Sequence, residues 1–238
     1  MVGKVPIITI DGLGGSGKTS IASQLASELG WYVLYSGLFY RYLAYCQKNM
    51  RFAIHGDYEI SDDLRDSLLN LRCRVNQSGD VVCLLVNEDL STVLSTESIG
   101  RDASLLAGIP RVREQLLEVQ RRFVRPPGLI AEGRDMARVV FPSALVRIYL
   151  FADEEVRVQR RFIQLNRCGN DVKIDQVALM QSKRDARDRV QAFKKMDERD
   201  GVIVLDTSKL SMGAVKARIY RALSEKGVVV NQPIDAIA

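Results

Sequence analysis

Short apolar runs alternate with amphipathic stretches along the first fifty residues. The run VPIITID (residues 5–11) is rich in β-branched residues and ends in Asp-Gly, which is typical of a buried parallel strand. Residues 18–29 then repeat apolar side chains at every fourth position, and Gly30 follows, which predicts an amphipathic helix that ends there. A second apolar run, residues 31–36, precedes another helical pattern. This order predicts a parallel sheet with helices on both of its faces.

The middle of the chain has a different pattern. Ser61 can cap a helix, and the runs LRCRVNQ and DVVCLLVNED flank a Ser-Gly turn, which favours an antiparallel hairpin. Together with a helical pattern near 95–107, this segment, residues 60–108, is predicted to be a small lobe inserted into the parallel sheet. We expect the chain to be one domain, residues 1–238, that contains this lobe. The remaining pattern predicts helices at 110–125, 153–168, 174–195 and 211–226, and strands at 128–133, 145–151 and 201–206.

The charge of the chain is concentrated in one segment. There are 34 basic and 29 acidic residues, a net charge of +5. Between Arg157 and Arg199 lie twelve basic and six acidic residues, so this segment carries +6 and the remainder −1. A local surplus of this kind predicts a binding site for anions. Only Phe162 and Phe193 are interleaved with it, which argues against a nucleic-acid surface.

Cysteine and histidine usage excludes several kinds of site. The four cysteines form no CxxC pair, which favours free thiols in a reducing compartment. The single histidine, His55, lies in a polar, turn-like stretch, so a histidine-based metal site or a Ser-His-Asp triad is excluded. No apolar run approaches the length of a membrane span, and the first residues lack a signal-peptide pattern. We expect a cytoplasmic protein that does not contact membranes.

Residues 12–19, GLGGSGKT, match G-x-x-x-x-G-K-[ST] between a predicted strand and a predicted helix. Glycines let successive N–H groups point into one concavity, where Lys18 reaches the β- and γ-phosphates of a nucleotide and the Thr19 hydroxyl can bind Mg²⁺. The dinucleotide pattern G-x-G-x-x-G is also satisfied, but the second strand ends in Tyr35-Ser36 instead of an acid. No Asn-Lys-x-Asp, the guanine-reading motif, is present. The motif therefore favours a loop that binds nucleotide phosphates over an ordinary tight turn.

Two further motifs fall where strands end at the ligand-binding edge of a parallel sheet. In SGLFYR, Ser36 could hydrogen-bond an acceptor and Arg41 could pair with its phosphate, or the two could be a helix cap and a surface arginine. In LIAEGRDM, Glu132 ends a strand, where a carboxylate for Mg²⁺ or its water shell would sit. Arg134 and Asp135 follow on the loop, either as site residues or as a solvated pair.

A third motif, KRDARDRVQ, lies in the basic segment. Residues three or four positions apart on a helix share one face, which here would carry Arg184, either Arg187 or Asp188, and Gln191. This face could line the anion site. Alternatively, the helix could be exposed and carry an ordinary Arg184–Asp188 pair, which would contribute only about 0.3–0.5 kcal/mol.

Taken in order, these motifs resemble those of the bacterial cytidylate kinases, the CMP/dCMP kinases of the nucleoside monophosphate kinase group. ITIDGLGGSGKTS resembles the family's phosphate loop, SGLFYR its acceptor segment, and LIAEGRDMARVVFP its G-R-D signature. DASLLAGIPRVREQLLEVQRRF resembles a stretch that supplies an acceptor serine and arginine. RRFIQL and KRDARDR resemble the lid, and VLDTSKLS the strand end near the adenine. The resemblance covers nearly the whole chain, including the lobe at 60–108, and places a helical lid at 157–195.

The resemblance implies an α/β fold of the P-loop nucleoside monophosphate kinase type and ATP-dependent phosphorylation of CMP and dCMP, with Mg²⁺, by a monomer. It implies that the ATP phosphates are held by Gly12, Leu13, Gly14, Gly15, Ser16, Gly17, Lys18, Thr19, Ser20 and, from the lid, Arg160, with Arg161 as a further lid cation. CMP would be surrounded by Ser36, Arg41, Ser104, Arg113, Arg134, Asp135, Arg184 and Asp188. The catalytic residues would be Lys18, Arg134, Asp135 and Arg184, and the metal ligand Thr19.

Several positions depart from the family's pattern. Tyr35 stands where the family usually has aspartate, Leu13 where proline is common, and Ala137-Arg138 where Gly-Thr is usual. Gln191 replaces an arginine, so one acceptor-phosphate cation is expected to be missing unless another arginine, such as Arg138, Arg187 or Arg189, substitutes. Two alternatives to a CMP kinase therefore stay open. One is a phosphate-loop kinase with another acceptor, such as UMP or a non-nucleotide. The other is a homologue that binds nucleotide with weakened catalysis.

Overall fold

The computed structural model describes residues 5–49, 54–55, 58–76, 81–86, 88–167, 172–190 and 201–228. Within these residues, the predicted parallel sheet is present and its order is β10-β9-β1-β8-β2. Every pairing in it is parallel. All five predicted strands of the large sheet are confirmed as β1 (Ile7–Gly12), β2 (Tyr32–Tyr35), β8 (Leu129–Gly133), β9 (Val146–Phe151) and β10 (Ile203–Asp206).

The first strand lies at the centre of the sheet. From β1 the chain passes beyond the position of β8 to form β2, while β9 and β10 add on the other side. The strand order therefore reverses at β1, and ligands of open parallel sheets bind at the carboxyl ends of the strands at such a point. In register, Asp11 of β1 lies beside Gly133 of β8 and Tyr149 of β9. The loops that leave β1 and β8 consequently start side by side.

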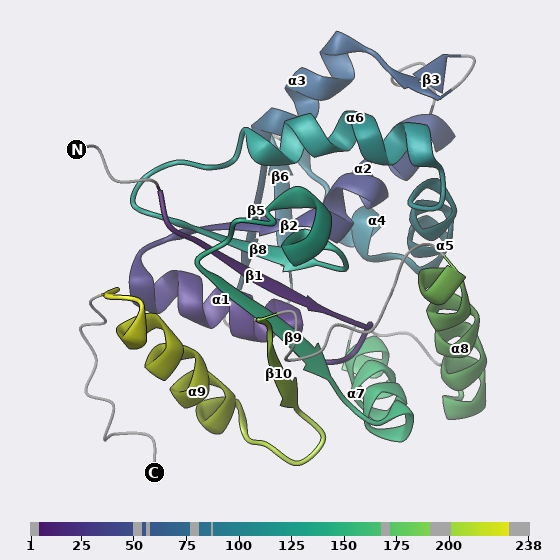
Figure 1. Cartoon of the computed structure of the whole chain (residues 1–238). Coiled ribbons are helices and arrows are strands. Elements are labelled where there is room, and N and C mark those ends of the chain that lie inside the picture. The colour runs from purple at the N-terminus through teal and green to yellow at the C-terminus, as the bar shows by residue number, and fades with distance from the viewer. Residues whose placement is uncertain are drawn as a thin grey trace.

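Helices cover both faces of the sheet, as Figure 1 shows. Alternation along β8 sends Leu129 and Ala131 to a core shared with α2 and α6, and Ile130 to a core shared with α1 and α9. Two further helices, α7 and α8, stand beyond the carboxyl ends of β1 and β9 (Figure 1). The helices are α1 (Lys18–Leu29), α2 (Ser36–Lys48), α6 (Pro110–Arg121), α7 (Glu154–Arg167), α8 (Ile174–Val190) and α9 (Met212–Glu225).

The segment predicted to be an inserted lobe holds an antiparallel sheet of its own, with strand order β5-β6-β7. The predicted cap is confirmed, since the Ser61 hydroxyl accepts a hydrogen bond from Leu64 N at 3.3 Å. The two-residue strand β7 was not predicted because so short a run shows no alternation. The role of the inserted lobe, residues 60–108, in binding an acceptor stays a prediction. The elements are β3 (Ile54–His55), β4 (Glu59–Ile60), α3 (Asp62–Asn70), β5 (Leu71–Val75), β6 (Val81–Leu85), β7 (Glu88–Asp89), α4 (Ser91–Ser95) and α5 (Glu97–Leu106).

Three details differ from the sequence prediction. The helix predicted at 110–125 ends at Arg121, because the chain tightens there into a hydrogen bond from Phe123 N to Gln120 O. His55 belongs to a two-residue strand instead of a turn. The loop after the G-R-D motif continues as a π-helical turn, η1 (Met136–Val140). The helix predicted at 174–195 is described as far as Val190, and Gln191 lies outside the described residues. Within the described residues, no helix combines the length and apolarity needed to cross a membrane.

Gly12, the last residue of β1, is the tightest position in the centre of the sheet. Its φ is +151°, and a Cβ there would lie 2.1 Å from the carbonyl oxygen of Leu150 in β9. We expect Gly12→Ala to lower the free energy of unfolding by about 3 kcal/mol or more, because backbone would have to move. Urea denaturation of the purified chain measures this loss.

A matched substitution, Gly37→Ala in α2, controls for the extra methyl group. A Cβ at Gly37 meets no atom within 4 Å, so the change should stabilise the helix by about 0.5–1 kcal/mol. If the two substitutions changed the free energy of unfolding equally, the close approach of β1 to β9 at Gly12 would be contradicted.

Candidate functional site

The loop after β1, residues 12–19, leads directly into α1 and is called the phosphate loop below. Gly17 caps α1 in the left-handed conformation with φ 88°, no side chain caps this helix, and its first turn holds no acidic residue. The N–H groups of that turn and the positive end of the helix dipole therefore point toward the loop without a protein counter-charge. The loop is closed by the Ser16 hydroxyl, which donates to Leu13 O at 2.9 Å. This geometry suits an anion.

Lys18 is buried beside Glu132, the last residue but one of β8. Its Nζ donates to Leu13 O at 2.8 Å and lies 3.8 Å from Glu132 Oε1. Burial, reinforced by nearby Arg134, lowers the pKa of Lys18 to about 7. A phosphate placed in the loop would favour the charged form of the lysine.

Thr19 and Glu132 bring two oxygens together at the mouth of the loop. The Thr19 hydroxyl donates to Glu132 Oε2 at 3.2 Å. Mg²⁺ keeps several waters and binds through one or two protein oxygens plus substrate phosphates, so this pair fits it. Among the described residues, no group of three or more histidine, cysteine or acidic side chains could hold a metal by itself. The pair fits a metal that arrives with a nucleotide.

Arg134 connects the phosphate loop to α8. Its Nη1 donates to Gly12 O at 2.5 Å and its Nε donates to Asp188 Oδ2 at 2.8 Å. Burial opposes its charge, but the surrounding carboxylates, Asp188 foremost and then Glu132 and Asp185, together outweigh burial and raise the pKa of Arg134. Asp135 pairs instead with Arg113 of α6. Adjacent Arg134 and Asp135 thus have separate partners and do not form the solvated pair that was one possibility.

Arg184 of α8 faces the other cations without a strong partner. Its Nε is buried and has no hydrogen-bond partner among the described residues. Burial, followed by the nearby charge of Arg134, lowers the pKa of Arg184. Since Asp188 is taken by Arg134, no Arg184–Asp188 ion pair offsets this charge in the described part of α8. Lys18, Arg134 and Arg184 therefore lie close enough to repel one another, and among these three only Arg134 has carboxylates that outweigh its burial.

Two further arginines, Arg41 and Arg187, join the inserted segment to α2 and α8. Arg41 of α2 donates from Nη1 to the carbonyl oxygens of Leu94, at 2.5 Å, and Thr96, at 3.1 Å, and burial lowers its pKa to about 10. Ser104 of α5 accepts a hydrogen bond from Arg187 Nε at 3.0 Å. α5 therefore meets both α2 and α8. Ser36 is buried at the start of α2.

The helices of the predicted lid contact the phosphate loop through its carbonyl oxygens. Arg157 donates to Gly14 O at 3.2 Å and to Asp185 of α8 at 2.6 Å. Arg160 donates to Gly15 O at 3.3 Å and to Thr207 O, after β10, at 2.6 Å. The Arg157–Asp185 pair was not predicted, because no motif marks it and only the fold brings the two helices together.

The predicted residues fall into three places. Arg161 pairs with Glu97 of α5 and donates to Gln164 of its own helix, and within the described residues no hydrogen bond or ion pair joins it to the phosphate loop. Tyr35 is buried at the end of β2, opposite Glu132 of β8, and burial raises the pKa of its phenol. The phosphate loop, Lys18, Thr19, Arg134, Arg160 and Arg184 gather at the ends of β1 and β8, and Arg41, Ser104, Arg113, Asp135 and Asp188 line the side toward α5 and α6.

Sequence reasoning missed Asp11, the last side chain of β1 before the phosphate loop. It is fully buried and accepts hydrogen bonds from Met136 N and Ala137 N, each at 2.8 Å. Burial raises the pKa of Asp11 to about 7. The carboxylate thus ties the loop that carries Arg134 to the strand that carries the phosphate loop. An acid at the end of an otherwise apolar strand was the available signal.

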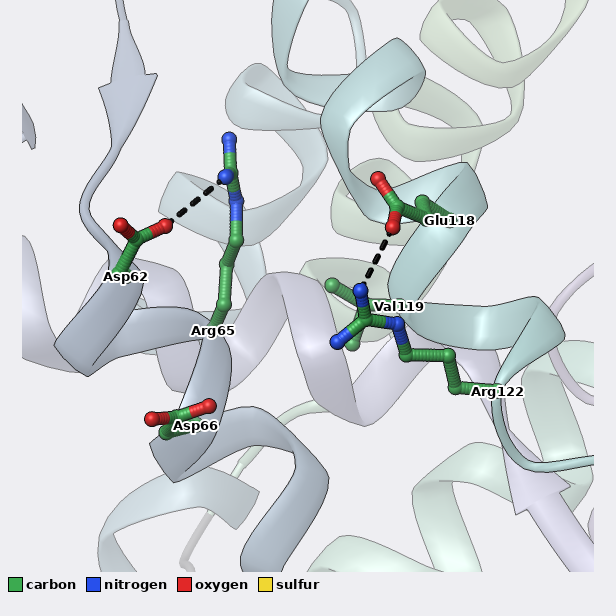
Figure 2. Close-up of a pocket in the computed structure, with 6 residues that line it drawn as sticks. All are labelled: Asp62, Arg65, Asp66, Glu118, Val119 and Arg122. Carbon is green, nitrogen blue, oxygen red and sulfur yellow. Dashed lines mark hydrogen bonds and ion pairs between the residues drawn. The ribbon is translucent and has the colours of Figure 1, made fainter.

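A separate cleft lies between α3 and α6 (Figure 2). Its two arginines are already paired within their own helices, Arg65 with Asp62 at 3.1 Å and Arg122 with Glu118 at 2.7 Å. Both carboxylates are largely exposed, so these pairs are weak and leave no buried charge in need of a ligand. The cleft shares no residue with the phosphate loop, and its chemistry does not suggest a second site. It is lined by Asp62, Arg65, Asp66, Glu118, Val119 and Arg122.

Comparison with known proteins identifies the family. The family model described as "Cytidylate kinase" matches residues 8–225. The chain belongs to the cytidylate kinase family. It is 40% identical to a cytidylate kinase of Pseudomonas putida over 96% of this chain and 100% of that protein. It is also 40% identical to one of Edwardsiella ictaluri, over 92% of this chain and 96% of that protein. This confirms the resemblance drawn from the motifs, although the role of each site residue stays a prediction.

The raised pKa of Asp11 makes the stability of this cytidylate kinase homologue depend on pH. A carboxyl whose folded pKa of about 7 exceeds its unfolded value of 3.8 stabilises the fold most at low pH, and this contribution is lost as the pH rises toward 7. Asp11→Asn removes the titration. We therefore expect the stability of the variant, relative to the unmodified chain, to increase by more than about 1 kcal/mol between pH 4 and pH 8.

Urea denaturation of both proteins at several pH values measures this difference. Asp11 faces Lys18, Asp135 and Tyr149, and these groups are present in both proteins, so the difference isolates Asp11. A stability difference that does not change with pH would contradict the burial of an ionisable carboxyl at this position.

Proposed function

We propose that this chain transfers the γ-phosphate of ATP to CMP or dCMP, giving ADP and CDP or dCDP. The observation that carries the proposal is the cluster of Lys18, Arg134 and Arg184 at the carboxyl edge of the sheet. Such a cluster is unfavourable alone and is stabilised by a polyanion. It occurs in a chain of the cytidylate kinase family, whose curated relatives are named for this activity.

The donor nucleotide would lie against the phosphate loop. Residues 12–20 would hold its phosphates through backbone N–H groups, with Lys18 as the nearest side-chain cation. Arg160 reaches both this loop and Thr207, so it links the phosphates to the strand end where the adenine is expected. Mg²⁺ would be held by Thr19, with Glu132 as a further ligand or as a partner of its water shell, and would neutralise phosphate charge.

The acceptor nucleotide would lie between α8, α5 and α6. Cytosine offers an N4 donor together with N3 and O2 acceptors, so a site that reads it needs both a carboxylate and donor groups. Asp188 and Asp135 supply carboxylates, while Arg113 and Ser104 supply donors. The acceptor phosphate would lie nearer Arg41 and the buried Ser36.

The proposed reaction needs no covalent intermediate. An oxygen of the CMP phosphate attacks the γ-phosphorus in line, and the charge that spreads over the phosphoryl oxygens is neutralised by Lys18, Arg134 and Arg184. Arg157 and Arg160 hold α7 against the loop and so exclude water, which would otherwise compete as acceptor. We further propose that the chain acts as a monomer on free nucleotides in the cytoplasm.

An acceptor panel tests the proposal directly. ADP formation from Mg-ATP is measured with CMP, dCMP, UMP and AMP. A site that pairs with the cytosine edge leaves polar groups unpaired with other bases, so kcat/KM for CMP and dCMP should exceed that for UMP and AMP by at least about 100-fold. Equal or absent stimulation by CMP would contradict the proposal and favour another acceptor or a homologue with little catalysis.

Two arginines on α6 provide a matched pair of variants for the panel. Arg113 pairs with Asp135 in the site, whereas Arg111 is exposed and lies 3.9 Å from Glu59. Arg113→Met should raise the KM for CMP by about tenfold or more with little change in the KM for ATP. Arg111→Met should leave both KM values unchanged. The opposite ranking would move the acceptor site away from Asp135.

A further inference from the structure

Two cysteines of the small sheet face one another. Cys73 of β5 and Cys83 of β6 are directly opposite in the antiparallel register. Cys83 is buried and Cys73 is partly accessible, whereas Arg72 and Arg74, the neighbours of Cys73 in sequence, are exposed on the opposite face. Both thiols therefore point to the same inner face of the hairpin.

Hydrogen bonding shows which kind of cross-strand pair this is. The backbone N–H of Cys83 donates to Ser91 Oγ at 2.9 Å, and its carbonyl oxygen accepts from Leu90 N at 2.9 Å. Both backbone groups of Cys83 are thus directed away from β5. Cys73 and Cys83 are consequently a non-hydrogen-bonded pair, for which Cα atoms lie about 4.5 Å apart. That separation is inside the range that a disulfide requires, roughly 4.4–6.8 Å.

The thiols already interact. The hydrogen bond that the Cys73 thiol makes with Cys83, together with burial, raises the pKa of Cys73. The other cysteines are placed differently. Cys46 is fully buried on α2, and Cys168 lies outside the described residues.

The pair is connected to the residues proposed to bind the acceptor. Ser91, the first residue of α4, accepts the hydrogen bond from Cys83 N. The carbonyl oxygen of Leu94, in the same helix, accepts a hydrogen bond from Arg41. Cys73 also packs against the core that contains Tyr35, the residue before Ser36. Fixing the hairpin would therefore constrain both ends of the segment that carries Ser36 and Arg41.

We propose that Cys73 and Cys83 are a reversible oxidation site, which low-molecular-weight disulfides convert into a cross-strand disulfide that lowers turnover of the acceptor. The loss of turnover rests on the proposed kinase function, whereas formation of the disulfide does not.

The oxidation proceeds by two exchange steps. The thiolate of partly accessible Cys73 attacks one sulfur of the small disulfide, forms a mixed disulfide and releases one small thiol. The thiolate of Cys83 then attacks the Cys73 sulfur and releases the second small thiol. The two protein thiols lose two electrons and two protons, and the small disulfide is reduced to two thiols. Because the pKa of Cys73 is raised, we expect oxidation over minutes to hours.

The experiment incubates the full chain with oxidised glutathione and maps its peptides without reduction. We expect one intramolecular link between the peptides that contain Cys73 and Cys83, a mass loss of about 2 Da, and full reversal by dithiothreitol. Cys168→Ser should retain the link, and Cys73→Ser should abolish it. Only glutathione adducts, or a link through Cys46 or Cys168, would overturn the site.

Kinetics of the same samples test the consequence. Oxidation should lower kcat/KM for CMP by about fivefold or more while the KM for ATP stays unchanged, and Cys73→Ser should be insensitive to the oxidant. A linked chain with unchanged CMP kinetics would overturn the coupling to the acceptor segment. If the reduced chain makes no ADP with CMP, the proposed function fails, while the peptide map still decides the oxidation site.

Discussion

The crowding of like charges around the phosphate loop is the constraint on which the rest of the structure depends. Lys18 is buried, Arg134 and Arg184 are half-buried beside it, and water screens repulsion between such cations less than it does on an exposed surface. Burial first, and then the nearby charge of Arg134, lowers the pKa values of Lys18 and Arg184, and Glu132 and Asp188 offset only part of this effect. Hydrogen bonds from Arg134 to Gly12 O and from Arg160 to Gly15 O hold these two arginines against the phosphate loop.

The scaffold meets this constraint by tying the loops of neighbouring strands together. β1 lies between β8 and β9, so the phosphate loop and the loop that carries Arg134 start at the same edge. Asp11 fixes the second loop through two backbone N–H groups, and the Arg157–Asp185 pair fixes α7 to α8. These contacts place charged groups where they are unfavourable alone, which is the compromise expected at a functional site. In the proposed function, two nucleotides supply the negative charge that these groups lack in the isolated chain.

The apolar runs and the phosphate-loop motif predicted the five strands of the large sheet, the helix after the loop and the edge at which the site lies, because these features depend on local periodicity and backbone chemistry. The partners of individual charges were not predictable in the same way. Arg134 pairs with Asp188 and Asp135 with Arg113, although Arg134 and Asp135 are adjacent in sequence. Such pairings depend on how α6 and α8 pack, which no local pattern encodes. The π-helical turn after Asp135 was missed for the same reason, since it is shaped by the carboxylate of Asp11.

The proposed function requires Arg184 to bind an anion, at a cost in stability to the isolated chain. Replacing it with methionine, Arg184→Met, keeps much of its volume and removes the charge. Urea denaturation without nucleotides should show the variant to be more stable by about 1–2 kcal/mol, and turnover with ATP and CMP should fall at least about 100-fold. Lys183→Met, on the exposed side of α8, controls for the loss of a cation and should change neither value appreciably. If Arg184→Met destabilises the chain and preserves turnover, Arg184 has a structural role in the fold and does not bind the transferred phosphate.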